Sequence, residues 1–122
     1  MINIVVRAVI NPTESEDKVS RAVENLFPNM EFNREENELV ARGNDINDLA
    51  ALKELLKNQN IRDAARSFLS KYEEGNTLLF ELNKQAAFAG RANFVDFDIA
   101  LGAITVEIKG SNLQGLIDWL CN

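Results

Sequence analysis

The residues that could do chemistry on a partner are concentrated in one segment, residues 82–94. Its 13 positions hold two cations, three side-chain amides and two phenylalanines. Cations pair with phosphates, amides donate to and accept from base edges, and a phenylalanine ring stacks on an unpaired base. The polar members are Asn83, Lys84, Gln85, Arg91 and Asn93. We therefore predict a surface for single-stranded or loop RNA here; the alternative is a solvated connection whose rings turn into the core.

A second group of cations lies earlier in the chain. Arg62 and Arg66 are four positions apart, so they share one face of a helix. Lys71 follows on the same predicted helix, and Lys53 and Lys57 repeat the spacing on the helix before it. Such a basic helix face could clamp phosphates, so Arg62 and Arg66 join the predicted RNA-binding residues. The alternative is an ordinary solvated helix face.

Two carboxylates offer a third chemistry. Asp96 and Asp98 share one face if their segment is extended, and paired carboxylates can hold Mg²⁺ or transfer protons. No neighbouring residue completes a metal cage or a nucleophile–base pair. A Mg²⁺-dependent enzyme at these residues is therefore a remote alternative, and we predict no metal and no cofactor.

The composition excludes several enzyme classes. The chain has no histidine, which excludes Ser–His–Asp and Cys–His catalysis and imidazole metal sites. The single cysteine, Cys121, cannot form an intrachain disulfide. The glycine motifs of dinucleotide, P-loop and nucleophile-elbow sites are missing. We therefore expect a binding module rather than an enzyme.

The ends and the charge of the chain point to a location and a partner. No apolar run approaches a membrane span, and no basic region precedes the first apolar stretch, so we expect a cytoplasmic protein without membrane contact. The formal net charge of −6 differs from the basic balance of typical nucleic-acid-binding domains. However, residues 51–91 carry 7 Lys or Arg against 5 Asp or Glu. An anionic partner would dock on this middle third.

Alternation and turn signals predict the first half of the fold. Residues 2–10 alternate as a strand buried on at least one face, and Thr13 with Glu16 forms a capping box for a helix. The apolar stripe of that helix is Val19, Ala22, Val23, Leu26 and Phe27. Residues 30–34 and 38–42 form a hairpin around a polar turn. A second helix is capped by Asp45 or Asn47.

The second half contains a further series of helices and strands. A third helix ends at Gly75, and residues 77–82 and 104–108 form strands. Between those strands, residues 83–93 form a loop or short helix and residues 94–99 are extended. Ser111 with Gln114 caps a last helix.

The resulting fold class is one α+β domain over residues 1–122. We predict a mainly antiparallel or mixed sheet with helices packed on one face, in the order β-α-β-β-α-α-β-(β)-β-α. The order invites comparison with the RNA-recognition motif, which stacks bases on aromatic side chains of its central strands. Residues 2–10 and 38–42 carry no aromatic residue, so that binding mode is disfavoured.

The last predicted helix has an unusually broad apolar stripe. Leu116 and Trp119 extend it beyond one face, and together with Leu120 they are the candidate residues of a dimer surface. Burial against the sheet is one explanation, and a symmetric homodimer is the other. A protein-interaction or dimeric assembly module is accordingly the alternative to RNA binding.

Parts of the chain resemble a known family. The segments are Phe80-Glu81-Leu82-Asn83-Lys84-Gln85-Ala86-Ala87 running into Gly90-Arg91 and Asn93-Phe94, then Leu101-Gly102-Ala103-Ile104, and Ile61-Arg62-Asp63-Ala64-Ala65-Arg66 ahead of Phe68-Leu69. Together they resemble an uncharacterised archaeal family, uncharacterised protein family two-zero-one. The resemblance implies a predicted RNA-binding protein, a fold similar to the ribosomal protein that binds 5S rRNA, no known enzymatic activity and a dimer as one option. It draws attention to Asn83, Lys84, Gln85, Arg91, Arg62 and Arg66.

Overall fold

The computed structural model describes residues 2–96 and 102–122, which form a sheet with helices on one of its faces. In chain order the elements are β1 (Ile2–Val9), α1 (Glu16–Leu26), β2 (Asn33–Glu35), β3 (Glu38–Gly43), the 3₁₀ helix η1 (Ile46–Leu49), α2 (Ala50–Asn58), α3 (Arg62–Lys71), β4 (Glu73–Glu74), β5 (Thr77–Asn83), α4 (Lys84–Phe88), β6 (Phe94–Val95), β7 (Ala103–Gly110) and α5 (Leu113–Leu120).

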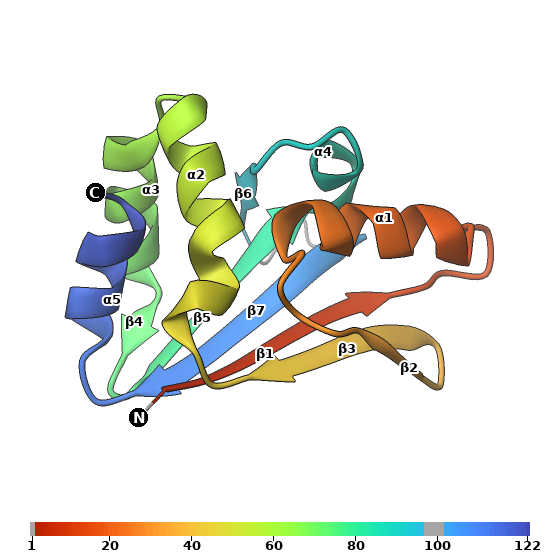
Figure 1. Ribbon diagram of the computed structural model, residues 1–122, viewed down its shortest axis with the longest axis horizontal. Helices are drawn as coiled ribbons and strands as arrows, with labels where there is room; N and C mark the ends of the chain where they lie inside the picture. Colours follow the sequence, from red (N-terminus) through yellow and green to blue (C-terminus); the bar gives the residue numbers. More distant parts are fainter. Residues whose placement is uncertain (1, 97–101) are drawn as a thin grey trace.

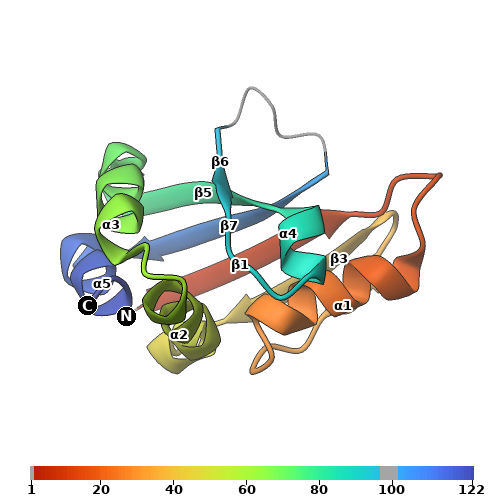
Figure 2. The ribbon, with the colours of Figure 1, turned by 90° about the horizontal axis from the view of Figure 1, so that it is seen from above.

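All strand pairs of this seven-stranded sheet are antiparallel. The strand order is β2-β3-β1-β7-β5-β4, and β6 also pairs with β5. The helices cover one face, with α3 and α5 at one end of the layer and α1 and α4 at the other (Figures 1 and 2). The predicted α+β class and the helices on one sheet face are confirmed.

The core lies between the helices and the alternating residues of the three central strands. Val6 of β1 lies opposite Val106 of β7, which lies opposite Phe80 of β5, and all three are fully buried. Each such side chain contributes roughly 1.5–3 kcal/mol of burial free energy. The residues between them in each strand face away from the helices; Arg7 and Lys109 are exposed there, whereas Glu81 is buried. The period of two in the sequence therefore identified the buried face.

The start of α1 differs from the prediction. Thr13 does not cap this helix; Ser15 holds the cap position, and its side chain makes no capping hydrogen bond. The turn before the helix is instead closed by Glu14, whose Oε1 accepts 2.9 Å hydrogen bonds from both the backbone N–H and the side-chain amide of Asn11. The predicted capping box was wrong because the Asn11–Glu14 contact organises the turn two residues before the helix begins.

Of the other two predicted helix caps, one is confirmed and one is wrong. Asp45 caps η1, with its side chain accepting from the Asn47 backbone N–H at 2.9 Å, which confirms one of the two predicted candidates. For α5, Asn112 rather than Ser111 is the cap, and its Oδ1 accepts from the Gly115 N–H at 3.1 Å. Asn and Ser are comparable cap residues, so neighbours of this kind are not distinguished by residue type alone.

Two short elements follow β5 in the described residues up to Asp96. Residues 84–88 form the five-residue helix α4, which was one of the two predicted forms. The predicted extended segment begins as β6 at Phe94–Val95, and residues 97–99 lie outside the described residues. Within the described ranges, no helix has the length and apolar character needed to cross a membrane.

Candidate functional site

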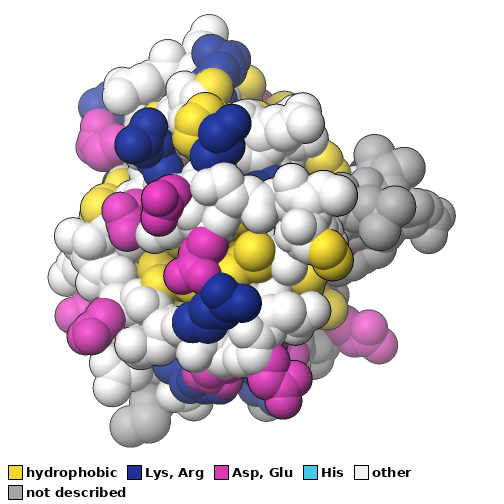
Figure 3. All heavy atoms as spheres, turned by 90° about the vertical axis from the view of Figure 1, so that its right-hand side faces the viewer, with side chains coloured by type: hydrophobic (Ala, Val, Ile, Leu, Met, Phe, Trp, Pro, Cys, Tyr) yellow, Lys and Arg dark blue, Asp and Glu magenta, His cyan; other side chains and the backbone are white. Residues whose placement is uncertain are grey.

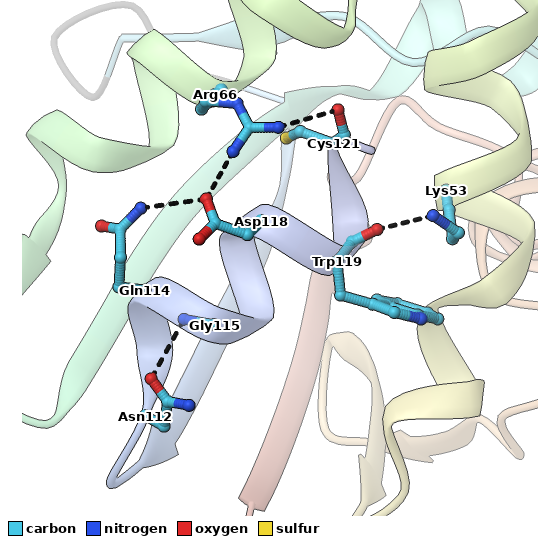
Figure 4. A network of polar contacts seen from close by, with 8 residues as sticks. All are labelled: Lys53, Arg66, Asn112, Gln114, Gly115, Asp118, Trp119 and Cys121. Carbon is cyan, nitrogen blue, oxygen red and sulfur yellow. Dashed lines mark hydrogen bonds and ion pairs between the residues drawn. The ribbon is translucent and has the colours of Figure 1, made fainter.

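Lys53 of α2 and Arg66 of α3 hold the C-terminal end of α5 (Figure 4). Arg66 forms an ion pair with Asp118, and its other guanidinium nitrogen donates to the Cys121 carbonyl at 3.3 Å. Lys53 donates to the Trp119 carbonyl at 2.6 Å, and its ammonium lies 5.1 Å from the centre of the Trp119 ring. Cations at a helix C-terminus satisfy its last carbonyls and complement its dipole. Lys53 and Arg66 therefore have a structural role within the chain.

Arg62 lies at the same end of the molecule. It is half-buried and lines a shallow surface hollow together with Arg66 and Asn122. Figure 1 places α3 and α4 at different ends of the helix layer, with α2 between them. The segment that carries Arg91 and Asn93 nevertheless contacts the end of α2, because Gln59 forms two hydrogen bonds with the backbone of Ala92.

The apolar stripe of α5 is largely used inside the chain. Leu120 is fully buried and Leu116 is 6% exposed, while Trp119 is half-buried. A homodimer through these residues stays a prediction, with little of the stripe left on the surface to form it.

Lys84, predicted to contact RNA, is instead buried. It is 6% exposed, and its ammonium donates to the Val9 carbonyl at 2.6 Å and to the two Glu14 carboxylate oxygens at 3.0 and 3.3 Å. The partial burial of Glu14 would by itself raise the pKa of its carboxyl. The hydrogen bonds from Asn11 and Lys84 and the charge of Lys84 outweigh burial and lower that pKa below its ordinary value. In this geometry the charge of Lys84 stabilises the junction of β1, α1 and α4 and is not presented to a partner.

Asn83 also has a structural role, as the N-cap of α4. Its Oδ1 accepts from the Ala86 N–H at 2.8 Å, and its backbone N–H donates to the Asn93 carbonyl at 2.8 Å. Gly90, at φ +80°, reverses the chain after α4, so that the Arg91 N–H donates to the Ala86 carbonyl at 2.9 Å. The side chains of Arg91 and Asn93 are exposed.

Helices α1 and α4 together build a surface that sequence analysis did not recognise as a unit. Phe88 is 39% exposed, one of the two large hydrophobic side chains that the described residues leave exposed. Lys18 and Arg21, one turn apart on α1, lie 6.0 and 5.8 Å from the centre of its ring. Gln85, exposed on α4 one turn before Phe88, completes what we call the α1–α4 platform: Lys18, Arg21, Gln85 and Phe88. Figure 3 shows Lys and Arg side chains beside hydrophobic atoms in the upper part of this face.

The platform is held in place by side-chain contacts to the backbone. Asn25 of α1 donates to the carbonyls of Ala87 and Phe88 at 2.9 and 3.2 Å. Gln59, just after α2, exchanges two hydrogen bonds with the backbone of Ala92, at 2.7 and 2.9 Å. These contacts hold the segment that carries Gln85, Phe88 and Arg91 at the end of α4 and again at Ala92.

A hollow lies beside the platform. Its volume is about 260 Å³, and it is lined by Glu14, Lys18, Val19, Lys84, Gln85 and Phe88. A second hollow, lined by Asn11, Glu14, Asn83, Lys84, Gln85 and Gly102, shares three of these residues. Glu14, Lys84 and Gln85 therefore line both hollows.

The platform combines predicted and unpredicted residues. Gln85 and Phe88 belong to the segment singled out from the sequence, whereas Lys18 and Arg21 come from a helix more than 60 positions earlier. Their position on the polar face of α1, between Glu16 and Glu24, gave no signal of a shared site. Only the packing of α1 against α4 brings them to Phe88.

The carboxylate pair is only partly described. Asp96 accepts a 2.7 Å hydrogen bond from the Tyr72 hydroxyl, and Asp98 lies outside the described residues. Among the residues with described positions, no group of three or more Asp, Glu, Cys or His could hold a metal ion. The remote Mg²⁺ alternative at Asp96 and Asp98 therefore stays a prediction.

Comparisons with known proteins identify the family. A family model described as RNA binding matches residues 3–110. A UPF0201 protein from Methanothermobacter thermautotrophicus is 40% identical over 98% of this chain and 91% of its own length. The chain belongs to the UPF0201 family. A UPF0201 protein from Thermococcus kodakarensis is also similar, with 39% identity over 94% of this chain and 86% of that protein.

Solved UPF0201 structures share the fold. The crystal structure of the Methanococcus jannaschii UPF0201 protein is 32% identical, with a TM-score of 0.83 over 98% of this chain and 99% of that one. The archaeal family expected from the sequence is thus confirmed. These UPF0201 names state no enzymatic activity, and RNA binding is the description of the family model.

Proposed function

We propose that this protein binds RNA through the α1–α4 platform and is not an enzyme. The observation that carries the proposal is the exposed Phe88 ring with Lys18 and Arg21 beside it. An aromatic ring and adjacent cations supply base stacking and phosphate pairing, the two contacts from which sequence-tolerant RNA surfaces are built. The family description of RNA binding supports the same function.

The predicted site residues take different parts in this proposal. Gln85, Arg91 and Asn93, which are exposed, contact the RNA directly. Asn83 and Lys84 act by holding α4, since their polar groups are used within the chain. Arg62 and Arg66 lie on α3, outside the platform, and Arg66 is already paired with Asp118. An RNA-binding role agrees with the expected cytoplasmic location.

The test is a charge reversal on the platform. We expect Lys18→Glu/Arg21→Glu to weaken RNA binding at least ~10-fold, because it removes two phosphate contacts and repels the backbone. Fluorescence anisotropy with labelled single-stranded RNA measures the change. The matched control is Lys57→Glu/Lys109→Glu, which alters the net charge equally at exposed positions away from the platform. Equal weakening by both variants would show that only net charge matters and would reject the platform as the site.

A further inference from the structure

We infer that the platform selects single-stranded RNA and receives one unpaired base, carrying an exocyclic amino group, in the hollow between α1 and α4. This inference rests on the proposed RNA-binding function and specifies its ligand. Its evidence is the size of the hollow and the chemistry of the groups that line it.

The size of the hollow limits what it can hold. At about 260 Å³ it falls below the roughly 300–1,000 Å³ of sites for drug-sized molecules. A single flat ring system fits such a volume, whereas a helical RNA stem does not enter it. Bases of a duplex are stacked on both faces and paired along their edges, so they cannot reach the Phe88 ring. An unpaired base can.

The lining provides one aromatic surface and polar groups of both kinds. Phe88 offers its ring for stacking, and the exposed Gln85 amide can both donate and accept. Lys18 lies at the same hollow and can pair with the phosphate attached to the bound base.

The carboxylate of Glu14 adds an acceptor at a fixed position. Its Oε1 accepts three hydrogen bonds, two from Asn11 and one from Lys84. Among the contacts that the structure describes, Oε2 accepts only the longer one from Lys84, at 3.3 Å. A carboxylate oxygen can accept more than one hydrogen bond, so Oε2 retains capacity for a donor from a ligand.

This acceptor discriminates between bases. Carboxylates accept hydrogen bonds from the amino group of cytosine, whereas uracil presents a carbonyl oxygen at the same ring position. Cytosine and uracil have the same ring size, so stacking on Phe88 differs little between them. The comparison of the two therefore isolates the contribution of the amino group.

The experiment compares three labelled RNAs on the native chain by fluorescence anisotropy. They are a short oligocytidylate, an oligouridylate of equal length and a blunt RNA duplex. We expect the oligocytidylate to bind at least ~5-fold more tightly than the oligouridylate, the lower end for one good base contact, and more tightly than the duplex. Phe88→Ala should weaken oligocytidylate binding roughly 5- to 150-fold, as removal of a stacking ring does.

Val9→Ala is the matched control for Phe88→Ala. Val9 is the other exposed large hydrophobic residue, at 41%, and lies on β1 outside the lining of the hollow. Val9→Ala should leave the affinity for oligocytidylate unchanged. Gln85→Leu, at an exposed position, should weaken binding of both single strands, because the Gln85 amide can bond to either base.

The outcomes separate the two proposals. Equal binding of the two single strands, or tighter binding of the duplex, overturns the inference. The proposed function still stands in that case if Lys18→Glu/Arg21→Glu weakens RNA binding. Absence of binding to all three RNAs overturns both. Cytosine preference that survives Phe88→Ala also overturns the inference, because the base is then bound elsewhere.

Discussion

Lys84 and Glu81 show how two charged side chains in neighbouring positions meet opposite environments. The ammonium of Lys84 donates to the Val9 carbonyl and to the Glu14 carboxylate, so its charge is paired inside the protein. Glu81, 7% exposed on β5, accepts from the Thr105 hydroxyl at 3.1 Å through one oxygen, while its Oε1 has no hydrogen-bond partner among the described residues. A buried charge is stabilising only when it is paired, so we expect opposite effects when each is neutralised.

Lys84→Met should destabilise the protein by about 2–3 kcal/mol at neutral pH, because the Val9 carbonyl and Glu14 lose their shared donor. The pKa of Glu14 is lower in the folded protein than its ordinary value of 4.5. The ionised carboxylate therefore contributes to the free energy of unfolding at a pH above 4.5, and this contribution is lost as the pH falls through the lowered pKa. The difference between native and variant should therefore shrink in acid. Urea unfolding followed by circular dichroism at several pH values measures it. Lys57→Met, at an exposed lysine, should change stability by less than about 0.5 kcal/mol.

Glu81→Gln should instead stabilise the protein, by about 1 kcal/mol at neutral pH. Burial raises the pKa of the Glu81 carboxyl, although the hydrogen bond from Thr105 partly opposes this. The folded state therefore disfavours the charged form, and the penalty appears as the pH rises above the ordinary value near 4.5. The gain from Glu81→Gln should vanish below that pH, which the same unfolding series tests. A gain that persists in acid would contradict this explanation.

At the scale of elements, α4 depends on its neighbours more than on its own sequence. A helix of five residues is far too short to be stable alone, since nucleation outweighs the few hydrogen bonds it forms. The Asn83 cap, the Asn25 contacts from α1 and the Gln59 contacts to Ala92 supply what is missing. The site that we propose is therefore positioned by its own N-cap and by residues of two elements distant in sequence, Asn25 of α1 and Gln59 just after α2.

Asn83→Ala should lower stability by about 1 kcal/mol through loss of the α4 cap. Because the Ala86 N–H loses its acceptor, its hydrogen exchange should accelerate more than that of the α1 amides. Asn83→Asp, which keeps a capping oxygen, should restore most of the protection. Uniform acceleration throughout the protein would indicate global destabilisation instead of local loss of α4.

At the scale of the whole molecule, charge is distributed so that a net acidic protein can still present a local basic surface. The formal net charge is −6, but Lys18, Arg21 and Arg91 are exposed on or next to the platform. The cations at the other end, Lys53 and Arg66, are occupied by the end of α5. The number of phosphate contacts available to an RNA is therefore small.

Three phosphate contacts predict a shallow salt dependence. The logarithm of the binding constant for single-stranded RNA should fall with the logarithm of salt concentration with a slope of about −2, using the coefficient for single strands. Anisotropy titrations over a range of KCl concentrations measure this slope. A slope several-fold steeper would require a larger basic surface than the platform and its neighbour Arg91.

What the sequence by itself determined was local. The alternation in residues 2–10 and 104–108 identified the buried face of β1 and β7, and the helical stripe of α1 is buried as predicted. Both follow from fixed periods of side-chain direction, which need no knowledge of distant partners. The caps of α1 and α5 were misplaced because several residues near each helix end can act as caps, and the surrounding contacts choose between them.

Only the tertiary structure decided which polar residues are free to act. Lys84 and Arg91 have similar chemistry in the sequence, yet one is buried against Glu14 and the other is exposed. The same holds for Arg66, which pairs with Asp118, and for Lys18 and Arg21, which gain a role only because α1 packs against α4. Whether a charged side chain is free to bind a partner depends on residues that the fold brings to it from tens of positions away. A local sequence pattern carries no information about those residues.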